Sequence, residues 1–360
     1  MILPENNRIP KKVKTVHLIA VCGTAMGALA CMLKDMGYHV TGSDNNIYPP
    51  MSRFLNEKGV SITAGFDGAH LSHRPDLVVV GNAVSRENAE VVATGEMALC
   101  YCSMPQAVNH FAAAGKRQVL VAGTHGKTTT SAILAWILFS AGREPSFIIG
   151  GILPNFMSNY RTGTGDCIVI EADEYDTAFF DKGPKFLHYT PDAAILTSVE
   201  FDHADIYRDL DHVRDAFGRF VAKIRPGSLL VSVDDDPNVT GLIGLVSCKQ
   251  LPYGTRTDSP WQLGETLIQP PLTRFQVIKN GKDYGSFRTR MIGAHNLKNT
   301  LAAIAVADYL GVTPEKIADA LDSFSGVRRR QEIRGEKRGV IVMDDFAHHP
   351  TAVKETLRAV

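Results

Sequence analysis

The sequence shows no excess of charge of either sign, which bears first on the ligands it can take. Lysines and arginines together number 38, aspartates and glutamates also number 38, and the formal net charge is +0. A general nucleic-acid-binding protein normally carries a basic field over its surface. The balance therefore argues against a nucleic-acid partner. Small anionic ligands stay possible, because a local site can be positive on a neutral protein.

Long apolar runs and paired cysteine motifs are also missing. No uninterrupted apolar stretch reaches the length of a membrane span, and the first residues lack the basic, apolar and small-residue regions of a signal peptide. The six cysteines show no zinc or redox spacing, since Cys100 and Cys102 form CxC and not CxxC. Such cysteines are typical of buried thiols in a reducing compartment. We expect a cytoplasmic protein without membrane insertion; the sequence gives no indication of its oligomeric state.

The pattern that is present indicates an α/β protein with more than one domain. Short apolar, β-branched runs alternate with helical patterns and glycine turns, which is typical of parallel sheets. We predict a Rossmann-like N-terminal domain over residues 1–112 and a central parallel-sheet domain of the P-loop ATPase type over 113–326. The turn "KNGKD" within 250–292 predicts a small antiparallel addition to the central sheet.

Residues 327–360 form a third stretch with one predicted strand, "GVIVMDDF", and one predicted helix. One strand and one helix cannot bury a core of their own. We expect this stretch to be the incomplete beginning of a C-terminal Rossmann-like domain.

A glycine-rich turn between a predicted strand and helix, "LVAGTHGKTTT", is the strongest local signal. Gly123 and Gly126 let backbone N–H groups point inward at a helix N-terminus, where an anion is favoured. Lys127 would add a point charge and Thr128 a hydroxyl for Mg²⁺. The loop is two residues shorter than the G-x-x-x-x-G-K-[ST] pattern, so a glycine turn with a chance Lys-Thr is the alternative. The preceding strand and following helix favour phosphate binding.

Acids and a histidine follow two further predicted strands, at the edge where open α/β sheets place ligands. "EADEYD" supplies Glu171, Asp173 and Glu174, and oxygen ligands of this kind suit Mg²⁺. "VEFDH" adds Glu200 and His203, a candidate for a second divalent ion. A solvated acidic loop and a structural histidine are the alternatives.

Two other segments indicate nucleotide contacts. "CGTAMG" carries Gly23 and Gly27 in a G-x-x-x-G arrangement, not the G-x-G-x-x-G fingerprint, and Asp44 after the next strand would suit a ribose hydroxyl. A nucleotide-like ligand is therefore favoured over NAD, and a plain Rossmann-like turn is the alternative. "HNLKN" places His295 and Asn296 at a helix start, where they could bond a base or cap the helix.

Together these segments resemble the Mur ligase family of ATP-dependent amide-bond ligases of peptidoglycan biosynthesis. The markers "GTHGKTTT", "EADE", "DH", "HNLKN", "RRRQE" and "DDFAHHP" occur in the family's order, from about residue 14 to the end. The compact phosphate loop matches the family's own form. The resemblance implies an enzyme that forms a C–N bond with ATP and Mg²⁺ as cofactors.

The substrate class implied by the resemblance is narrower. "GTHGKTTT", "EADE" and "HHPT" resemble the branch that acts on UDP-N-acetylmuramate. "CGTAMGALA" and "EADEYDTAFFDKGPKF" resemble its recycling members. These join the murein tripeptide L-alanyl-γ-D-glutamyl-meso-diaminopimelate to that sugar through an acyl phosphate. The alternatives are an L-alanine-adding ligase and, more remotely, an NAD-dependent oxidoreductase or a non-catalytic nucleotide-binding module.

Residue roles also follow from the resemblance, position by position. Catalysis is implied for Lys127, Glu171 and His203, and metal binding for Thr128, Glu171 and His203. ATP contacts are implied for Gly123, Thr124, His125, Gly126, Lys127, Thr128, Thr129, His295, Asn296, Asn299, Arg330 and Asp345. UDP-sugar contacts are implied for Gly23, Thr24, Gly27, Ser43, Asp44 and Asn82. Because the family's third domain closes over ATP, we expect this chain to bind the UDP-sugar but to turn over little.

Overall fold

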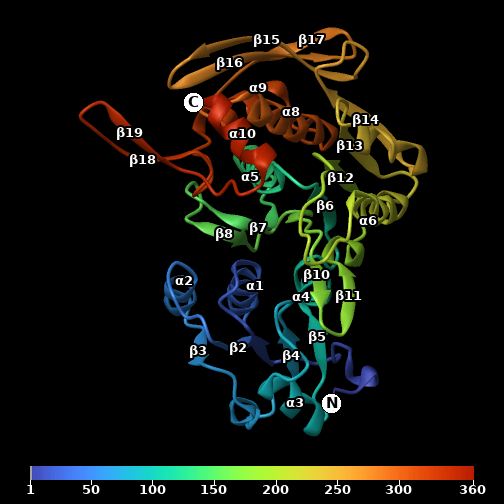
Figure 1. The fold of residues 1–360 in the computed structure, drawn as a ribbon, viewed down its shortest axis with the longest axis vertical. Helices are drawn as coiled ribbons and strands as arrows, with labels where there is room; N and C mark the ends of the chain where they lie inside the picture. The colour runs from blue at the N-terminus through green and yellow to red at the C-terminus, as the bar shows by residue number, and fades with distance from the viewer. Residues whose placement is uncertain (1) are drawn as a thin grey trace. The chain divides into compact units, whose positions relative to one another are not determined.

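The computed structural model describes residues 2–360 and divides into two compact units (Figure 1). The first unit runs up to Gly115 and also takes in Tyr160–Thr162 and Tyr175–Tyr189. The second comprises Lys116–Asn159, Gly163–Glu174 and Thr190–Val360. Within the described residues, no helix combines the length and the apolar character that a membrane crossing requires.

The first unit is built on a five-stranded sheet with the order β3-β2-β1-β4-β5, in which every neighbouring pair is parallel. Its strands are β1 (Thr15–Ile19), β2 (His39–Asp44), β3 (Ser61–Ala64), β4 (Leu77–Val80) and β5 (Tyr101–Ser103). Its helices are α1 (Thr24–Asp35), α2 (Met51–Glu57), α3 (Ala89–Glu96) and α4 (Met104–Ala107). The strand order reverses between β1 and β4, and such a switch point opens a crevice at the carboxyl ends of the strands. The Rossmann-like fold predicted for this part is confirmed.

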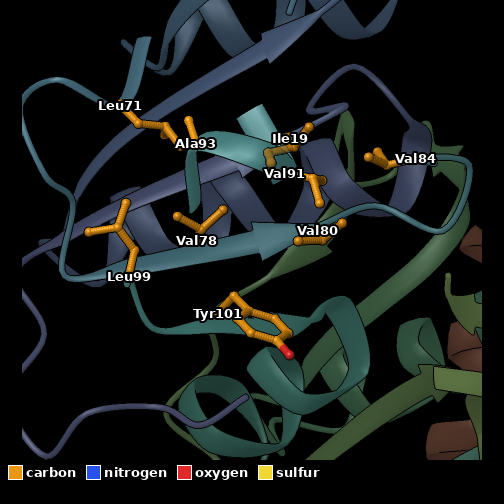
Figure 2. Packing of buried hydrophobic residues seen from close by; sticks show 9 residues of the cluster. All are labelled: Ile19, Leu71, Val78, Val80, Val84, Val91, Ala93, Leu99 and Tyr101. Atoms are coloured by element: carbon orange, nitrogen blue, oxygen red, sulfur yellow. The ribbon is translucent and has the colours of Figure 1, made fainter. Parts of the chain in front are cut away.

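One buried hydrophobic cluster of the first unit lies between β1, β4 and α3 (Figure 2). Its buried side chains are mostly β-branched or aliphatic: Ile19, Leu71, Val78, Val80, Val84, Val91, Ala93, Leu99 and Tyr101. Strand β5 begins at Tyr101, and residues 97–100 separate it from the end of α3 at Glu96. The first turn of α3 is capped by the Asn88 side chain.

A hairpin from far along the chain completes this core. Strands β10 (Asp176–Ala178) and β11 (Asp181–Pro184) pair antiparallel and belong to the first unit. Phe179 and Phe180 at their turn pack against the core. The Phe180 and Tyr101 rings meet edge to face, with their centroids 4.9 Å apart. The stretch directly after "EADE" is therefore part of the first unit.

The second unit is built on a ten-stranded sheet with the order β17-β16-β15-β14-β13-β12-β6-β9-β7-β8. Its central pairs, from β14 to β7, are parallel, and β15, β16 and β17 form an antiparallel end. The first six of its strands in chain order are β6 (Arg117–Ala122), β7 (Ser146–Leu153), β8 (Ser158–Arg161), β9 (Cys167–Glu171), β12 (Ala193–Leu196) and β13 (Leu229–Val233). The remaining four are β14 (Lys249–Gly254), β15 (Trp261–Gln269), β16 (Leu272–Lys279) and β17 (Lys282–Thr289). Both the parallel sheet and the hairpin predicted at "KNGKD" are confirmed.

Helices cover this sheet, and α8 and α9 lie beside the antiparallel end (Figure 1). The helices of the unit are α5 (Lys127–Ser140), α6 (Leu210–Ala222), α7 (Pro237–Thr240), α8 (Ala294–Tyr309), α9 (Pro314–Ser323) and α10 (Pro350–Ala359). Shorter helical turns across the chain are η1 (Pro4–Asn6), η2 (Gly68–Leu71), η3 (Val108–Ala112), η4 (Lys185–His188) and η5 (Ile243–Leu245). Helix α5 packs against both α8 and α9, so the helix after the phosphate loop is held from two sides.

The last part of the chain forms a projecting hairpin followed by α10. Strand β18 (Glu332–Lys337) pairs antiparallel with β19 (Val340–Asp344). The sequence predicted β19 and the helix but not β18, whose residues "EIRGEK" are mostly charged or glycine and are almost all exposed. Pairing with β19, not burial, defines this strand.

Candidate functional site

The compact glycine turn connects β6 directly to α5. Gly123 has φ +134° and Gly126 has φ +79°, a region that favours glycine. A Cβ on Gly123 would lie 2.1 Å from Thr197 Oγ1, and one on Gly126 would lie 2.5 Å from Asn299 Oδ1. Neighbouring elements therefore hold the turn closely on both sides. Its shape leaves the first N–H groups of α5 available for an anion.

Lys127, the first residue of α5, is folded back over the turn. Its Nζ donates to the Gly123 carbonyl at 2.6 Å and to Glu174 Oε1 and Oε2 at 2.9 and 2.7 Å. Burial by itself lowers the pKa of Lys127, but the charges of Glu174 and Asp173 outweigh it and the pKa is raised. The site thus holds a charged ammonium group at the base of the loop.

Thr128 and Glu171 meet because β6 and β9 are neighbours in the sheet, with Val121 beside Glu171 in register. The Thr128 hydroxyl donates to Glu171 Oε1 at 2.8 Å, and the Gly150 N–H donates to Oε2 at 2.6 Å. Burial raises the pKa of Glu171, against the opposing effects of Gly150 and Lys127. A hydroxyl and a carboxylate at this point are the hard oxygen donors that Mg²⁺ prefers, so the residues fit that ion.

His203 also approaches the Glu174 carboxylate. Its Nε2 is 3.5 Å from Glu174 Oε1, and its backbone has φ +58°. Burial tends to lower the pKa of His203, but hydrogen bonding and the charge of Glu174 raise it. Glu174 is 2% exposed. Because its carboxylate contacts both side chains, it links Lys127 to His203. The sequence indicated the acids of "EADE" in general but did not assign this linking role to Glu174.

The start of α8 lies against the same loop and offers unused polar atoms. His295 Nδ1 and Gln331 Nε2 are buried without a hydrogen-bond partner within the described part of the chain. Burial lowers the pKa of His295. Asn296 Nδ2 donates to Gln331 Oε1 at 2.9 Å, and Asn299 contacts the loop at Gly126. Buried unsatisfied polar groups are uncommon, and these fit a ligand with edge donors and acceptors such as a purine base. Gln331 was not among the predicted residues.

The remaining predicted ATP contacts differ in where their side chains lie. Arg330 approaches the loop, with its guanidinium 3.4 Å from Thr128 Oγ1 and stacked over the Phe346 ring. Asp345 instead accepts N–H groups from Gln331 and Ala347 at 2.9 and 2.7 Å, which organises its own turn. The other predicted positions lie in or next to the loop; Thr124 and Thr129 are buried, and His125 is half-buried.

The first unit contains a separate pocket of about 580 Å³ at its switch point. The loops after β1, β2 and β4 line it, including the predicted residues Gly23, Asp44 and Asn82. Asp44 accepts the N–H groups of Cys22 and Asn46, both at 2.8 Å, so it shapes the pocket wall. Burial, with a smaller effect from Asp44, raises the pKa of Cys22 to about 11, and this thiol is therefore protonated at neutral pH.

Three predicted UDP-sugar residues are not in the pocket lining. Thr24 begins α1, and Gly27 allows close packing, since a Cβ there would lie 2.4 Å from Met51 Cε. Ser43 is fully buried, and its hydroxyl donates to Glu90 at 2.5 Å. Gly27 and Ser43 therefore contribute to the packing of the first unit, whereas Thr24 is exposed.

Glu90 is the centre of a buried network that the sequence did not reveal. Besides Ser43, His70 Nδ1 lies 2.6 Å from Glu90 Oε1 and His17 Nε2 lies 3.4 Å from Oε2. Burial tends to raise the pKa of Glu90, but the bonds from His17, Ser43 and His70 lower it overall. The three partners come from segments distant in sequence, so no local spacing could have signalled the network.

Comparison with known proteins follows the same division of the chain. The family model of the Mur ligase middle domain matches residues 121–307, and that of the Mur ligase family catalytic domain matches residues 15–116. An Escherichia coli K12 protein named UDP-N-acetylmuramate–L-alanyl-gamma-D-glutamyl-meso-2,6-diaminoheptandioate ligase is 42% identical over 346 residues, covering 96% of this chain and 75% of its own length. A UDP-N-acetylmuramate–L-alanine ligase of Desulfatibacillum aliphaticivorans is 36% identical, covering 97% of this chain and 75% of its own. The crystal structure of a murein peptide ligase from Psychrobacter arcticus 273-4 superimposes with a TM-score of 0.83 at 38% identity, covering 96% of this chain and 75% of that one.

Proposed function

Because this chain belongs to the Mur ligase family, we propose that it joins L-alanyl-γ-D-glutamyl-meso-diaminopimelate to UDP-N-acetylmuramate in an ATP-dependent reaction. The choice of the tripeptide over L-alanine as the amine substrate rests on the 42% identity with the E. coli tripeptide ligase over 96% of the chain. The L-alanine ligase of D. aliphaticivorans is 36% identical over a similar span. The reaction forms a C–N bond and belongs to peptidoglycan recycling.

The second unit provides the ATP site in this proposal. Lys127 and the N–H groups at the start of α5 would hold the phosphates, and His295 with Asn296 would face the base. Support comes from the Lys127 ammonium group at the base of the loop and from His295 Nδ1, which has no hydrogen-bond partner among residues 2–360. Thr128 and Glu171 would hold Mg²⁺, with His203 as the predicted ligand of a second ion. Bound Mg²⁺ would neutralise phosphate charge as it develops.

Two chemical steps follow from the substrates. The lactyl carboxylate of the UDP-sugar attacks the terminal phosphorus atom of ATP, which gives an acyl phosphate and ADP. The alanyl amine of the tripeptide then attacks the acyl carbon, and inorganic phosphate leaves. Negative charge accumulates in the first step. Preorganised cations such as Lys127 and Arg330 lower the free energy of the transition state of this step. Glu174 has to share the Lys127 ammonium group with the incoming phosphates.

The pocket of the first unit would hold the UDP part of the sugar substrate. Its volume of about 580 Å³ lies in the usual range for small-molecule sites, and Gly23, Asp44 and Asn82 line it. Six free cysteines among the described residues agree with a reducing compartment, and we place the protein in the cytoplasm.

The test measures both binding and turnover. Calorimetry with the chain should detect UDP-N-acetylmuramate, and in a separate titration ATP with Mg²⁺. ADP release should then depend on UDP-N-acetylmuramate and be faster with the tripeptide than with L-alanine. Faster release with L-alanine would assign the chain to the alanine-adding ligases. Failure to bind either nucleotide would overturn the ligase proposal itself.

A further inference from the structure

We propose that His125, Glu200 and His349 form a binding site for a divalent transition-metal ion of the Zn²⁺ type. This site is distinct from the Thr128–Glu171 pair. It does not depend on the ligase reaction proposed above. The three residues come from separate segments of the second unit: the phosphate loop, the stretch after β12, and the residue before α10.

The separations between the ligand atoms fit such an ion. One nitrogen or oxygen atom from each residue lies within 4.8 Å of the others. His125 Nε2 is 3.3 Å and His349 Nδ1 is 3.6 Å from Glu200 Oε2. Ligands at Zn²⁺ distances of about 2.0–2.1 Å in a tetrahedron are about 3.3 Å apart. Small side-chain movements would therefore bring all three into coordination.

The protons of His349 give a second, independent reason to place a cation here. Its Nε2 lies 3.2 Å from the Phe201 carbonyl, an acceptor, so Nε2 carries a proton and donates it. In the neutral ring Nδ1 is then a bare acceptor, and it faces a carboxylate oxygen of Glu200. Its other neighbour is the Thr351 N–H, a long contact at 3.3 Å that a metal bond would replace. Two acceptors that face each other are stabilised by a cation between them.

The surroundings resemble those of a prepared metal site. A metal-binding histidine usually donates its second ring N–H to a carbonyl or carboxylate, as His349 does. The carboxylate is also oriented, because the Thr351 hydroxyl donates to Glu200 Oε2 at 2.7 Å. The side chains are partly accessible, at 22% for His125, 34% for Glu200 and 16% for His349. Solvent can therefore reach the site and supply a fourth ligand.

The donor set selects the class of metal. Two imidazole nitrogens and one carboxylate oxygen suit Zn²⁺ and neighbouring first-row ions, and the same set occurs in zinc enzymes. Mg²⁺ prefers oxygen donors alone and would instead use the Thr128–Glu171 pair. A bound ion would fasten the start of α10 to the phosphate loop and to the end of β12, which would hold the last part of the chain in place.

The experiment titrates the metal-free chain with Zn²⁺ by calorimetry in the presence of excess Mg²⁺. We expect one tight Zn²⁺ site, and loss of at least about tenfold in affinity in His349→Ala and in Glu200→Gln. His348→Ala is the matched control, because His348 is the adjacent exposed histidine and its Nδ1 bonds to the Phe346 carbonyl. Far-UV circular dichroism of each variant without metal shows whether it is folded.

Substitution of Co²⁺ for Zn²⁺ gives a readout of the coordination itself. Co²⁺ bound with low-symmetry coordination absorbs visible light. The site is supported if this absorption appears in the parent chain and in His348→Ala, and is lost in the folded His349→Ala and Glu200→Gln variants. Zn²⁺ affinity that is the same in all four proteins would place the metal elsewhere, for example on cysteines, and overturn the proposal. Absence of stoichiometric Zn²⁺ binding would show that a proton, not a metal, lies between His349 and Glu200.

Discussion

At the scale of single residues, Glu174 of the second unit shows how a buried carboxylate and a buried lysine depend on each other. It is 2% exposed, accepts two bonds from Lys127 and lies beside His203, while the Tyr207 hydroxyl donates to its backbone carbonyl. A carboxylate and an ammonium group that are buried together depend on each other, since either one alone would be an uncompensated charge. Glu174 therefore sets the position and the protonation of the lysine that the phosphate loop presents.

Replacement of Glu174 by Gln tests this dependence. The amide can still accept a bond but no longer offsets the Lys127 charge, so we expect the second unit to lose about 3 kcal/mol of unfolding free energy. Both tryptophans, Trp136 and Trp261, lie in this unit, and their fluorescence in guanidinium reports its unfolding. Asp258→Asn, which removes an exposed ion pair with Arg256, is the control and should change little. Equal stability of Glu174→Gln and the parent chain would contradict the buried-pair interpretation.

Glu90 gives the corresponding prediction for the first unit. Its pKa is lower in the folded chain than the ordinary value of 4.5, because His17, Ser43 and His70 favour the ionised form over the cost of burial. The stabilisation is therefore fully present above about pH 4.5 and is lost as the pH falls through the folded pKa. Glu90→Gln should cost about 2 kcal/mol near neutral pH, and the difference from the parent chain should shrink in more acidic solution.

Hydrogen exchange resolved to peptides of β1 and α3 measures this difference at several pH values, after correction for the intrinsic exchange rate. His17 and His70 are the titratable side chains bonded to Glu90, so the profile is read together with His70→Gln. A difference between parent chain and Glu90→Gln that grows toward low pH would have the wrong sign and would refute this account.

At the scale of elements, the compact phosphate loop depends on where its neighbours pass. Gly123 lies against the end of β12, and Gly126 lies against the start of α8, so two segments distant in sequence fix a turn of four residues. A longer loop could bulge away from these neighbours, whereas this one is confined by them. The tight turn therefore keeps Lys127 and Thr128 at the edge of the sheet, beside the acids that follow β9.

Gly123→Ala, compared with a control glycine, separates the strain of a left-handed backbone from the collision of a new Cβ with Thr197. Gly227→Ala is the matched control, because its φ of +90° is also positive but a Cβ there would meet nothing within 4 Å. The control should cost about 1 kcal/mol from the left-handed backbone alone. Gly123→Ala should cost about 3 kcal/mol or more and weaken ATP binding, because its Cβ collides with Thr197. Tryptophan fluorescence in denaturant and nucleotide calorimetry measure the two effects, and equal losses in both variants would exclude the collision.

The sequence predicted the elements that carry local signals. The phosphate turn, the strand before "EADE" and the "KNGKD" hairpin each contain their own pattern of glycine, apolar and turn residues, and the structure has them. Strand β18 was missed because a charged, exposed strand lacks the alternation by which strands are recognised. The partners of Glu90 and the contact of His125 with His349 were also missed, since only tertiary folding brings such residues together.

At the scale of the whole molecule, the proposed sites for the UDP-sugar and for ATP lie in different units. The pocket at the switch point belongs to the first unit, and the phosphate loop with its acids belongs to the second. Each unit has its own sheet and its own buried core. Ligand binding should therefore stabilise the units one at a time.

Hydrogen exchange with each ligand alone tests this division. Saturating UDP-N-acetylmuramate should protect the pocket loops near Cys22, Asp44 and Asn82, and ATP with Mg²⁺ should protect residues 123–130. A ligand at about a hundred times its dissociation constant stabilises its unit by about 2.7 kcal/mol, which is a large change in exchange. Protection of the phosphate loop by the UDP-sugar, with the pocket loops unchanged, would reverse the assignment.

The hairpin β10–β11 has a consequence for how the protein is made. The first unit needs Tyr175–Tyr189, yet residues 116–159 and 163–174 of the second unit precede that segment in the chain. During translation the first unit therefore cannot be finished when residue 115 leaves the ribosome, and part of the second unit has to wait unpaired or fold provisionally. Phe179 and Phe180 arrive late to cover Tyr101 and its neighbours. If translation paused before residue 189, the nascent first unit would expose the apolar surface around Tyr101, and chaperones bind surfaces of this kind.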